Sequence, residues 1–188
     1  MKQAHPTATI AVWAEDEHRL GLLPVVRRVW APKGQRPTAR VARHYQWLSV
    51  YGFVRPSTGH SWWRLLPTVT TAAMSLALAT FAHDEGIDAT HRAVLVLDQA
   101  SWHVSGRLVV PAGIELVFLP AYSPELQPAE RLWPLLDEPL ANRALGTMTA
   151  LETVLVDRCR TLEADPPRLK AHTHYHWWPS EPPAQTVQ

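Results

Sequence analysis

The first third of the chain alternates short apolar runs with turn residues, a pattern typical of β-strands. These runs are rich in β-branched and aromatic residues, and prolines and glycines separate them. Closely spaced strands joined by tight turns predict an antiparallel meander. The predicted strands cover residues 7–14, 27–31, 46–54 and 61–66, with turns at 32–35 and 56–59.

The period of the apolar positions changes after the fourth strand. Met74, Leu78 and Phe81 recur at helical spacing, so residues 71–83 predict a helix with an apolar stripe facing a core. The threonines before it are candidate caps. Residues 93–97 are then entirely apolar, which predicts a strand covered on both faces.

The second half continues with helices and one more strand. Residues 101–110 predict a short helix, and residues 114–119 predict a strand. Pro128 marks the start of the next helix, because a proline at the first helical position gives up no needed N–H. Pro134 should kink that helix. The last predicted helix begins at residues 149–152, which form a capping box.

This order of elements predicts an α/β fold. An antiparallel meander is followed by strands that alternate with helices, so we expect a mixed sheet, antiparallel and then parallel, flanked by helices. A chain of 188 residues is long enough for one domain with a sizeable core. We expect that domain to cover residues 1–170 and a C-terminal tail to cover residues 171–188.

The composition excludes several classes of protein. Hydrophobic residues make up 46% of the chain and charged residues 19%, which is typical of a globular protein and not of a disordered one. The longest apolar candidate, residues 72–82, is too short to cross a membrane. Cys159 is the single cysteine, which excludes an internal disulfide and fits a reducing compartment. Because the N-terminus also lacks a signal-peptide core, we expect a cytoplasmic protein.

Basic residues are concentrated in one stretch, although the net charge is only +1. Residues 27–43 contain six arginines and lysines and no acidic residue. Such a stretch could neutralise DNA phosphates, and a solvated loop is the alternative interpretation. The predicted contacts to the DNA backbone are Arg27, Arg28, Lys33, Arg36 and Arg40.

Three carboxylates stand at the ends of predicted elements. Asp16 and Asp98 each follow an apolar strand, and Glu130 lies in the first turn of a helix, where the helix dipole favours a negative charge. Bringing three carboxylates together is costly unless a cation compensates their repulsion. Mg²⁺ prefers oxygen ligands, and two such ions about 4 Å apart are typical of phosphoryl-transfer sites. We therefore predict a divalent-metal site.

Four motifs, taken in order, resemble the catalytic domain of DDE transposases in the insertion-sequence branch of the Tc1/mariner superfamily. The motifs are EDE at 15–17, WAPKGQRP at 30–37, VLDQASWH at 96–103 and LPAYSPELQPAERLW at 119–133. The resemblance covers roughly residues 8–165. It implies an RNase H-like fold, and DNA cleavage and strand transfer that depend on Mg²⁺ or Mn²⁺, with two ions. It also implies that Asp16, Asp98 and Glu130 are the catalytic metal ligands.

The chain departs from the family in two ways. Gln99 and Gln127 stand where the family often has asparagine, which lengthens each arm by one carbon. Full-length relatives also have an N-terminal helix-turn-helix region, whereas this chain begins almost at the first catalytic strand. We therefore expect that end recognition is missing or comes from a separate chain. Cutting of paired ends suggests a homodimer.

Other interpretations remain open. The enzyme could be an RNase H-like nuclease that does not join strands, or the chain could be a silent DNA-binding remnant of a decayed element. His103 could contact DNA, orient a carboxylate or lie on a plain helix face, and we include it among the DNA contacts. His172, His174 and His176 could bind zinc on an extended strand, but no cysteine or acid completes the set.

Overall fold

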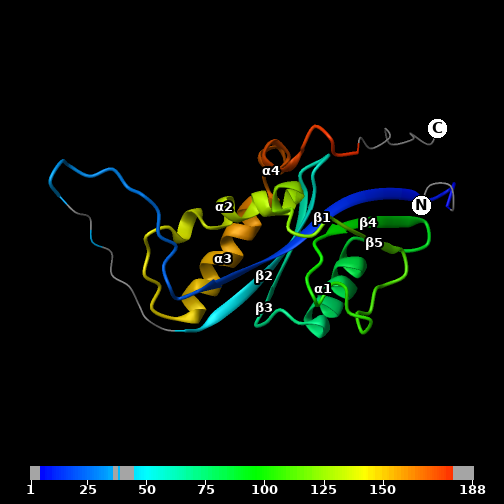
Figure 1. Ribbon diagram of the computed structural model, residues 1–188, viewed down its shortest axis with the longest axis horizontal. Coiled ribbons are helices and arrows are strands. Elements are labelled where there is room, and N and C mark those ends of the chain that lie inside the picture. Colours follow the sequence, from blue (N-terminus) through cyan, green and yellow to red (C-terminus); the bar gives the residue numbers. More distant parts are fainter. Residues whose placement is uncertain (1–4, 36–37, 39–44, 180–188) are drawn as a thin grey trace.

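A single mixed sheet organises the described residues, 5–35, 38 and 45–179, of the computed structural model. The strand order is β3-β2-β1-β4-β5. β1, β2 and β3 pair antiparallel, whereas β4 and β5 extend the sheet in parallel from β1 (Figure 1). The mixed sheet predicted from the sequence is confirmed. The strands are β1 Thr9–Gly21, β2 Trp47–Arg55, β3 His60–Leu66, β4 His91–Leu97 and β5 Ile114–Phe118.

β1 is the central strand, and it changes partner along its length. Its first half, up to Ala14, pairs with β4, and its second half pairs with β2 from Ala14 to Gly21. The sequence predicted that the strand would end at the acidic residues 15–17, and this was wrong. β2 pairs straight through them, and their side chains alternate between the two faces of the sheet, which limits their repulsion.

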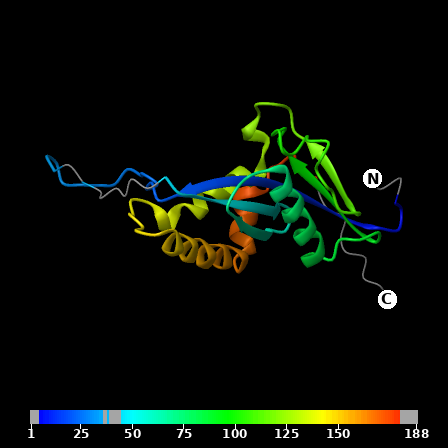
Figure 2. The same cartoon turned by 90° about the horizontal axis from the view of Figure 1, so that it is seen from below.

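Helices cover both faces of the sheet. α1, Thr71–Asp84, was predicted correctly and packs its buried Met74, Leu78 and Phe81 on one face. The opposite face is covered by the later helices, and Figures 1 and 2 show α1 and α3 on either side of the strands. The later elements are η1 Pro124–Leu126, η2 Pro128–Leu132, α2 Trp133–Leu136, η3 Glu138–Leu140, α3 Met148–Glu163 and α4 Pro166–Thr173.

Two predicted elements are absent from the described residues. Residues 27–31 form no strand but belong to an exposed segment, which follows β1 and runs away from the sheet (Figure 1). Residues 101–110 form turns instead of a helix, because His103 turns inward and the side chain of Asp98 accepts the Ala100 N–H.

Helix starts also differ from the prediction. Pro128 does begin a helical segment, but its first turn is a 3₁₀ helix, and α2 begins at Trp133, so Pro134 lies at a helix start and needs no N–H there. α3 begins earlier than predicted, because Thr147 caps it by accepting the Ala150 N–H at 3.1 Å.

The end of the described chain is part of the core. α4 was not predicted, and it runs through residue 170, where the expected domain ends. Beyond it, Trp178 is buried in the same apolar cluster as Leu155 and Leu162 of α3. Among the described residues, no helix combines the length and apolar character needed to cross a bilayer.

Candidate active site

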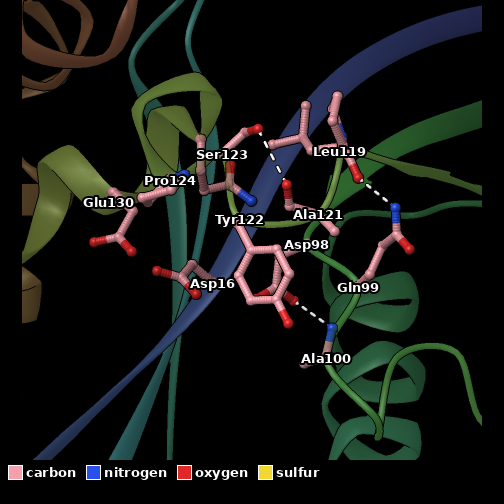
Figure 3. Close-up of a pocket in the computed structure, with 12 residues that line it drawn as sticks. Asp16, Asp98, Gln99, Ala100, Leu119, Ala121, Tyr122, Ser123, Pro124 and Glu130 are labelled. Carbon is pink, nitrogen blue, oxygen red and sulfur yellow. Dashed lines mark hydrogen bonds between the residues drawn. The ribbon is translucent and has the colours of Figure 1, made fainter.

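The three predicted carboxylates line one cavity of about 370 Å³. Asp16 comes from β1, Asp98 directly follows β4, and Glu130 belongs to η2 (Figure 3). The register of the sheet explains why two of them meet. Asp16 and Asp98 each lie two residues beyond the paired Ala14 and Val96, so both project from the same edge of the parallel pair.

Gln127 ties Glu130 to the central strand. Its amide nitrogen donates to the carbonyl of Glu15 at 2.9 Å, and its amide oxygen accepts the Ala129 N–H at 3.4 Å. The first bond fastens the start of η2 to β1, and the second caps η2. The side chain of Gln127 is buried between β1 and η2.

Gln99 makes a similar link on the other side of the cavity. Its amide nitrogen donates to the carbonyl of Leu119 at 2.8 Å. This bond joins the loop after β4, which carries Asp98, to the loop after β5. Both glutamines that depart from the family pattern thus act between elements of the cavity wall.

Asp16 is held by a tryptophan. The Trp133 indole N–H donates to Asp16 Oδ2 at 2.7 Å, and the indole stacks on His18 with ring centroids 5.0 Å apart. Gly52, paired with Asp16 across β2, makes room for this indole, because a Cβ at that position would lie 2.8 Å from Trp133 Cη2.

The surroundings of Asp16 favour a cation. The pKa of Asp16 is raised to about 7, chiefly by burial and also by the nearby Glu130 and Glu17, while the Trp133 N–H acts in the opposite direction. Asp16 and Glu130 point toward one another (Figure 3). A divalent cation would relieve this repulsion, and an all-carboxylate donor set open to water fits Mg²⁺ or Mn²⁺.

A second group of polar side chains lies behind the cavity, on the opposite face of β1. Glu15 and Glu17 flank Asp16 in the sequence and therefore project to the other side, where they meet the ring of His103. His103 Nε2 lies 3.1 Å from Glu17 Oε1 and 3.6 Å from Glu15 Oε2. The Trp102 indole N–H also donates to Glu17 Oε1, at 2.8 Å. We call Glu15, Glu17 and His103 the rear cluster.

The rear cluster touches the cavity through Asp98. His103 Nδ1 lies 2.8 Å from Asp98 Oδ1. Burial lowers the pKa of His103, but its bonds to Glu17 and Asp98 outweigh this, so its pKa is raised. Burial and the neighbouring acids raise the pKa of Glu15 well above its usual value.

The burial of His103 corrects one predicted role. Only 2% of the residue is exposed, so its ring has no surface to offer DNA. Neither Glu15 nor Glu17 was predicted as a functional residue. The alternation of side chains along a strand would have revealed them, had the strand been extended through the three acids.

Three of the predicted DNA contacts lie on the segment that leaves β1. Arg27, Arg28 and Lys33 are exposed there. Arg27 is also anchored, because its guanidinium donates to the Pro134 carbonyl at 2.8 Å and its backbone exchanges hydrogen bonds with the Asn142 side chain. Arg36 and Arg40 lie outside the described residues.

Two further observations concern other side chains. Tyr122, which was not predicted as a site residue, lines the cavity, is fully exposed and has a φ of 58°. Among the described residues, the ligand atoms of the rear cluster all lie within 4.8 Å of one another. His172, His174 and His176 form no such group, so the structure does not support the zinc alternative.

The sequence matches the family model described as DDE superfamily endonuclease over residues 11–152. The chain belongs to the DDE superfamily endonucleases. This confirms the family resemblance predicted from the four motifs. The uncharacterized protein y4pE/y4sA of Sinorhizobium fredii (strain NBRC 101917 / NGR234) is 43% identical over 98 residues, covering 52% of this chain and 71% of that protein.

Solved structures of Mos1 share the fold of this DDE endonuclease domain. The Mos1 mariner paired-end complex with Mn superposes with a TM-score of 0.58 at 17% identity, covering 88% of this chain and 56% of that one. The Mos1 strand transfer complex gives a TM-score of 0.57 at 18% identity, with coverage of 88% and 55%. The likeness confirms the predicted RNase H-like fold. The chain spans about half the length of these Mos1 chains.

Proposed function

We propose that this DDE endonuclease domain is the catalytic domain of a transposase, which cleaves DNA and then joins the freed strand to target DNA. The observation that carries the proposal is the convergence of Asp16, Asp98 and Glu130 on one open cavity from three separate elements. Such a triad of carboxylates fits phosphoryl transfer, and the family match supports DNA as the substrate.

The three carboxylates would hold one or two divalent cations, Mg²⁺ or Mn²⁺. Bound there, the ions would activate an attacking oxygen and stabilise the leaving one in an in-line displacement. The chain's own part is to fix the ligands. Trp133 holds Asp16, Gln127 fastens the helical turn of Glu130 to β1, and the Ala100 N–H holds Asp98 at 2.9 Å.

The reaction would proceed in two steps at the same cavity. Water attacks a DNA phosphodiester first, and the broken P–O bond leaves a free 3′-OH. That hydroxyl then attacks a phosphodiester of target DNA and displaces its 3′-oxygen. Arg28 and Lys33 are exposed and would contact the DNA backbone. Their positive charges attract the phosphates, and salt weakens this attraction.

The proposal extends to partners. One Mos1 structure is a paired-end complex with a left transposon end, and another is a strand transfer complex. By analogy, we propose that two copies of this chain act on paired DNA ends in the cytoplasm. We further propose that a separate helix-turn-helix chain recognises the end sequence.

Cleavage of a labelled, pre-nicked DNA duplex tests the function. The wild type is compared with Asp98→Asn, which removes a ligand charge, and with Asp157→Asn, which removes an exposed charge on α3. We expect cleavage that needs Mg²⁺ or Mn²⁺, that is lost in Asp98→Asn and that survives in Asp157→Asn.

The products separate the alternatives. Joined strands identify a transposase, whereas hydrolysis alone identifies a nuclease. If the wild type neither cleaves DNA nor binds Mn²⁺ more tightly than Asp98→Asn, the three carboxylates are not a working metal site and the proposal is wrong.

A further inference from the structure

His103 is the buried link between the two strands that carry the first two acids. Its ring is closed off from solvent, and each of its nitrogens faces a carboxylate. Nε2 faces Glu17, the neighbour of Asp16 on β1, and Nδ1 faces Asp98 after β4. The ring therefore spans the edge at which β1 and β4 part.

The contacts on Asp98 are one-sided. Within the described part of the chain, Asp98 accepts two hydrogen bonds, from the Ala100 N–H at 2.9 Å and from His103 Nδ1 at 2.8 Å, and both end on Oδ1. A carboxylate oxygen accepts hydrogen bonds, so in this contact Nδ1 is the ring nitrogen that carries the hydrogen. Two donors on one oxygen fix the rotation of the carboxylate and leave Oδ2 for another partner.

The rear cluster could instead be a metal site in its own right. Glu15 supports that interpretation, because it is fully buried and neither of its oxygens has a hydrogen-bond partner among the described residues. The contacts of His103 argue against it. Nε2 is within hydrogen-bond distance of Glu17, Trp102 also occupies that Glu17 oxygen, and Glu15 lies farther away at 3.6 Å. The direct hydrogen bonds favour a rigid support over an ion cage.

We propose that His103 is a positioning residue of the catalytic site, which holds Asp98 Oδ1 so that Oδ2 is presented to the cavity. Glu17 orients the ring from behind, in the way that a carboxylate orients a histidine in many metal centres. The proposal rests on the proposed function, because it takes Asp98 as a metal ligand. It adds that Glu17, which lies beside Asp16, and Asp98 are coupled through the ring of His103.

Two substitutions separate positioning from simple packing. The amide nitrogen of asparagine can replace Nδ1 as a donor, whereas that of glutamine reaches the place of Nε2. His103→Asn should keep the bond to Asp98, and His103→Gln should keep the bond to Glu17 and lose the one to Asp98. His103→Asn gives up the contacts of Nε2 with Glu17 and with the Trp102 N–H, both at 3.1 Å, whereas His103→Gln gives up the contact of Nδ1 with Asp98. Packing alone therefore predicts an effect of His103→Asn at least as large as that of His103→Gln.

Mn²⁺ binding to the metal-free protein, measured by calorimetry, is the decisive readout. We expect His103→Gln to weaken Mn²⁺ binding about 10- to 100-fold and His103→Asn to stay within about threefold of the wild type. Urea unfolding checks that both variants fold. The same two substitutions at His60, whose ring pairs with Glu85 at 3.0 Å outside the cavity, control for the difference between the two amides.

Each result has a distinct meaning. Equal Mn²⁺ affinities for the two His103 variants, or a larger loss in His103→Asn, would overturn the positioning role. If Asp98→Asn also binds Mn²⁺ like the wild type, the proposed metal site itself fails. Metal analysis of the purified protein gives one more outcome. An ion that copurifies with the wild type and is lost in Glu15→Gln would make the rear cluster a metal site and refute this inference.

Discussion

The hydrogen bond from Trp133 to Asp16 sets how easily a cation can replace a proton at Asp16. Trp133→Phe keeps a ring between His18 and Gly52 but removes the N–H that lies 2.7 Å from Oδ2. A hydrogen bond to a charged group contributes about 1.5–3 kcal/mol. At about 1.4 kcal/mol per factor of ten, its loss should weaken metal binding about 10- to 100-fold near neutral pH.

The direction follows from the pKa of Asp16. Burial has already raised that pKa to about 7, and the Trp133 N–H holds it down. Removing the N–H raises the pKa further, so a proton competes more strongly with the cation near pH 7. Above both pKa values Asp16 is ionised in either protein, and the difference in metal affinity should shrink.

The assay is the Mn²⁺ concentration that gives half-maximal DNA cleavage, measured at about pH 7 and about pH 9. Trp63→Phe is the matched control, because Trp63 lies in the same apolar cluster and its N–H donates to Ser61 Oγ, not to a carboxylate. Both variants should lose about 1–3 kcal/mol of stability, but only Trp133→Phe should need more Mn²⁺. A requirement that is unchanged, or equally raised at both pH values, would refute the reasoning.

Three further substitutions test the scaffold. Gly52→Ala should cost about 1–3 kcal/mol and weaken Mn²⁺ binding, since its Cβ would displace the Trp133 indole, and calorimetry checks both effects. Leu155→Ala on α3 should lower the free energy of unfolding by about 2–5 kcal/mol in urea, because Leu155 is fully buried, without changing the Mn²⁺ requirement. Glu15 has a raised pKa when folded, so stability should fall as pH rises above the unfolded value near 4.5; Glu15→Gln should flatten that fall in urea titrations, and an equally steep fall would contradict it.

The sequence was a good guide where local pattern and sheet register agree. The all-apolar run before Asp98 and the apolar run before Asp16 predicted two neighbouring strands, and parallel pairing then brings their ends together. The proline before Glu130 predicted a helical start. These signals placed carboxylates at the ends of three elements, and the family resemblance selected Asp16 among the three adjacent acids.

The rear cluster could not be predicted for a physical reason. Three adjacent acids suggest a strand end, because their charges repel one another and a solvated turn tolerates that repulsion better than a sheet does. Pairing with β2 overrides this tendency by sending Glu15 and Glu17 to the face opposite Asp16. His103 was predicted on a helix, and its inward turn depends on the side chain of Asp98, a contact that periodicity does not report.

α4 was not predicted, although the sequence at its start carries a helix signal. Pro166 and Pro167 occupy the first turn of the helix, where no N–H is needed. Asp165 caps this turn by accepting the Arg168 N–H at 3.2 Å. Adjacent prolines after a capping residue indicate a beginning as readily as an end.

The alternation of acids on β1 has a consequence for how this gene can vary. A slip of one residue between β1 and β4 would send Glu15 or Glu17 into the cavity and turn Asp16 toward His103. Carboxylates would still occupy both faces, but a glutamate would stand in place of an aspartate and an aspartate in place of a glutamate, so each side chain would differ in length by one carbon. Deleting a single codon between Thr9 and Asp16 should therefore be more damaging than most substitutions of the same residues. Reading-frame-preserving indels in this strand are the changes that selection should remove first.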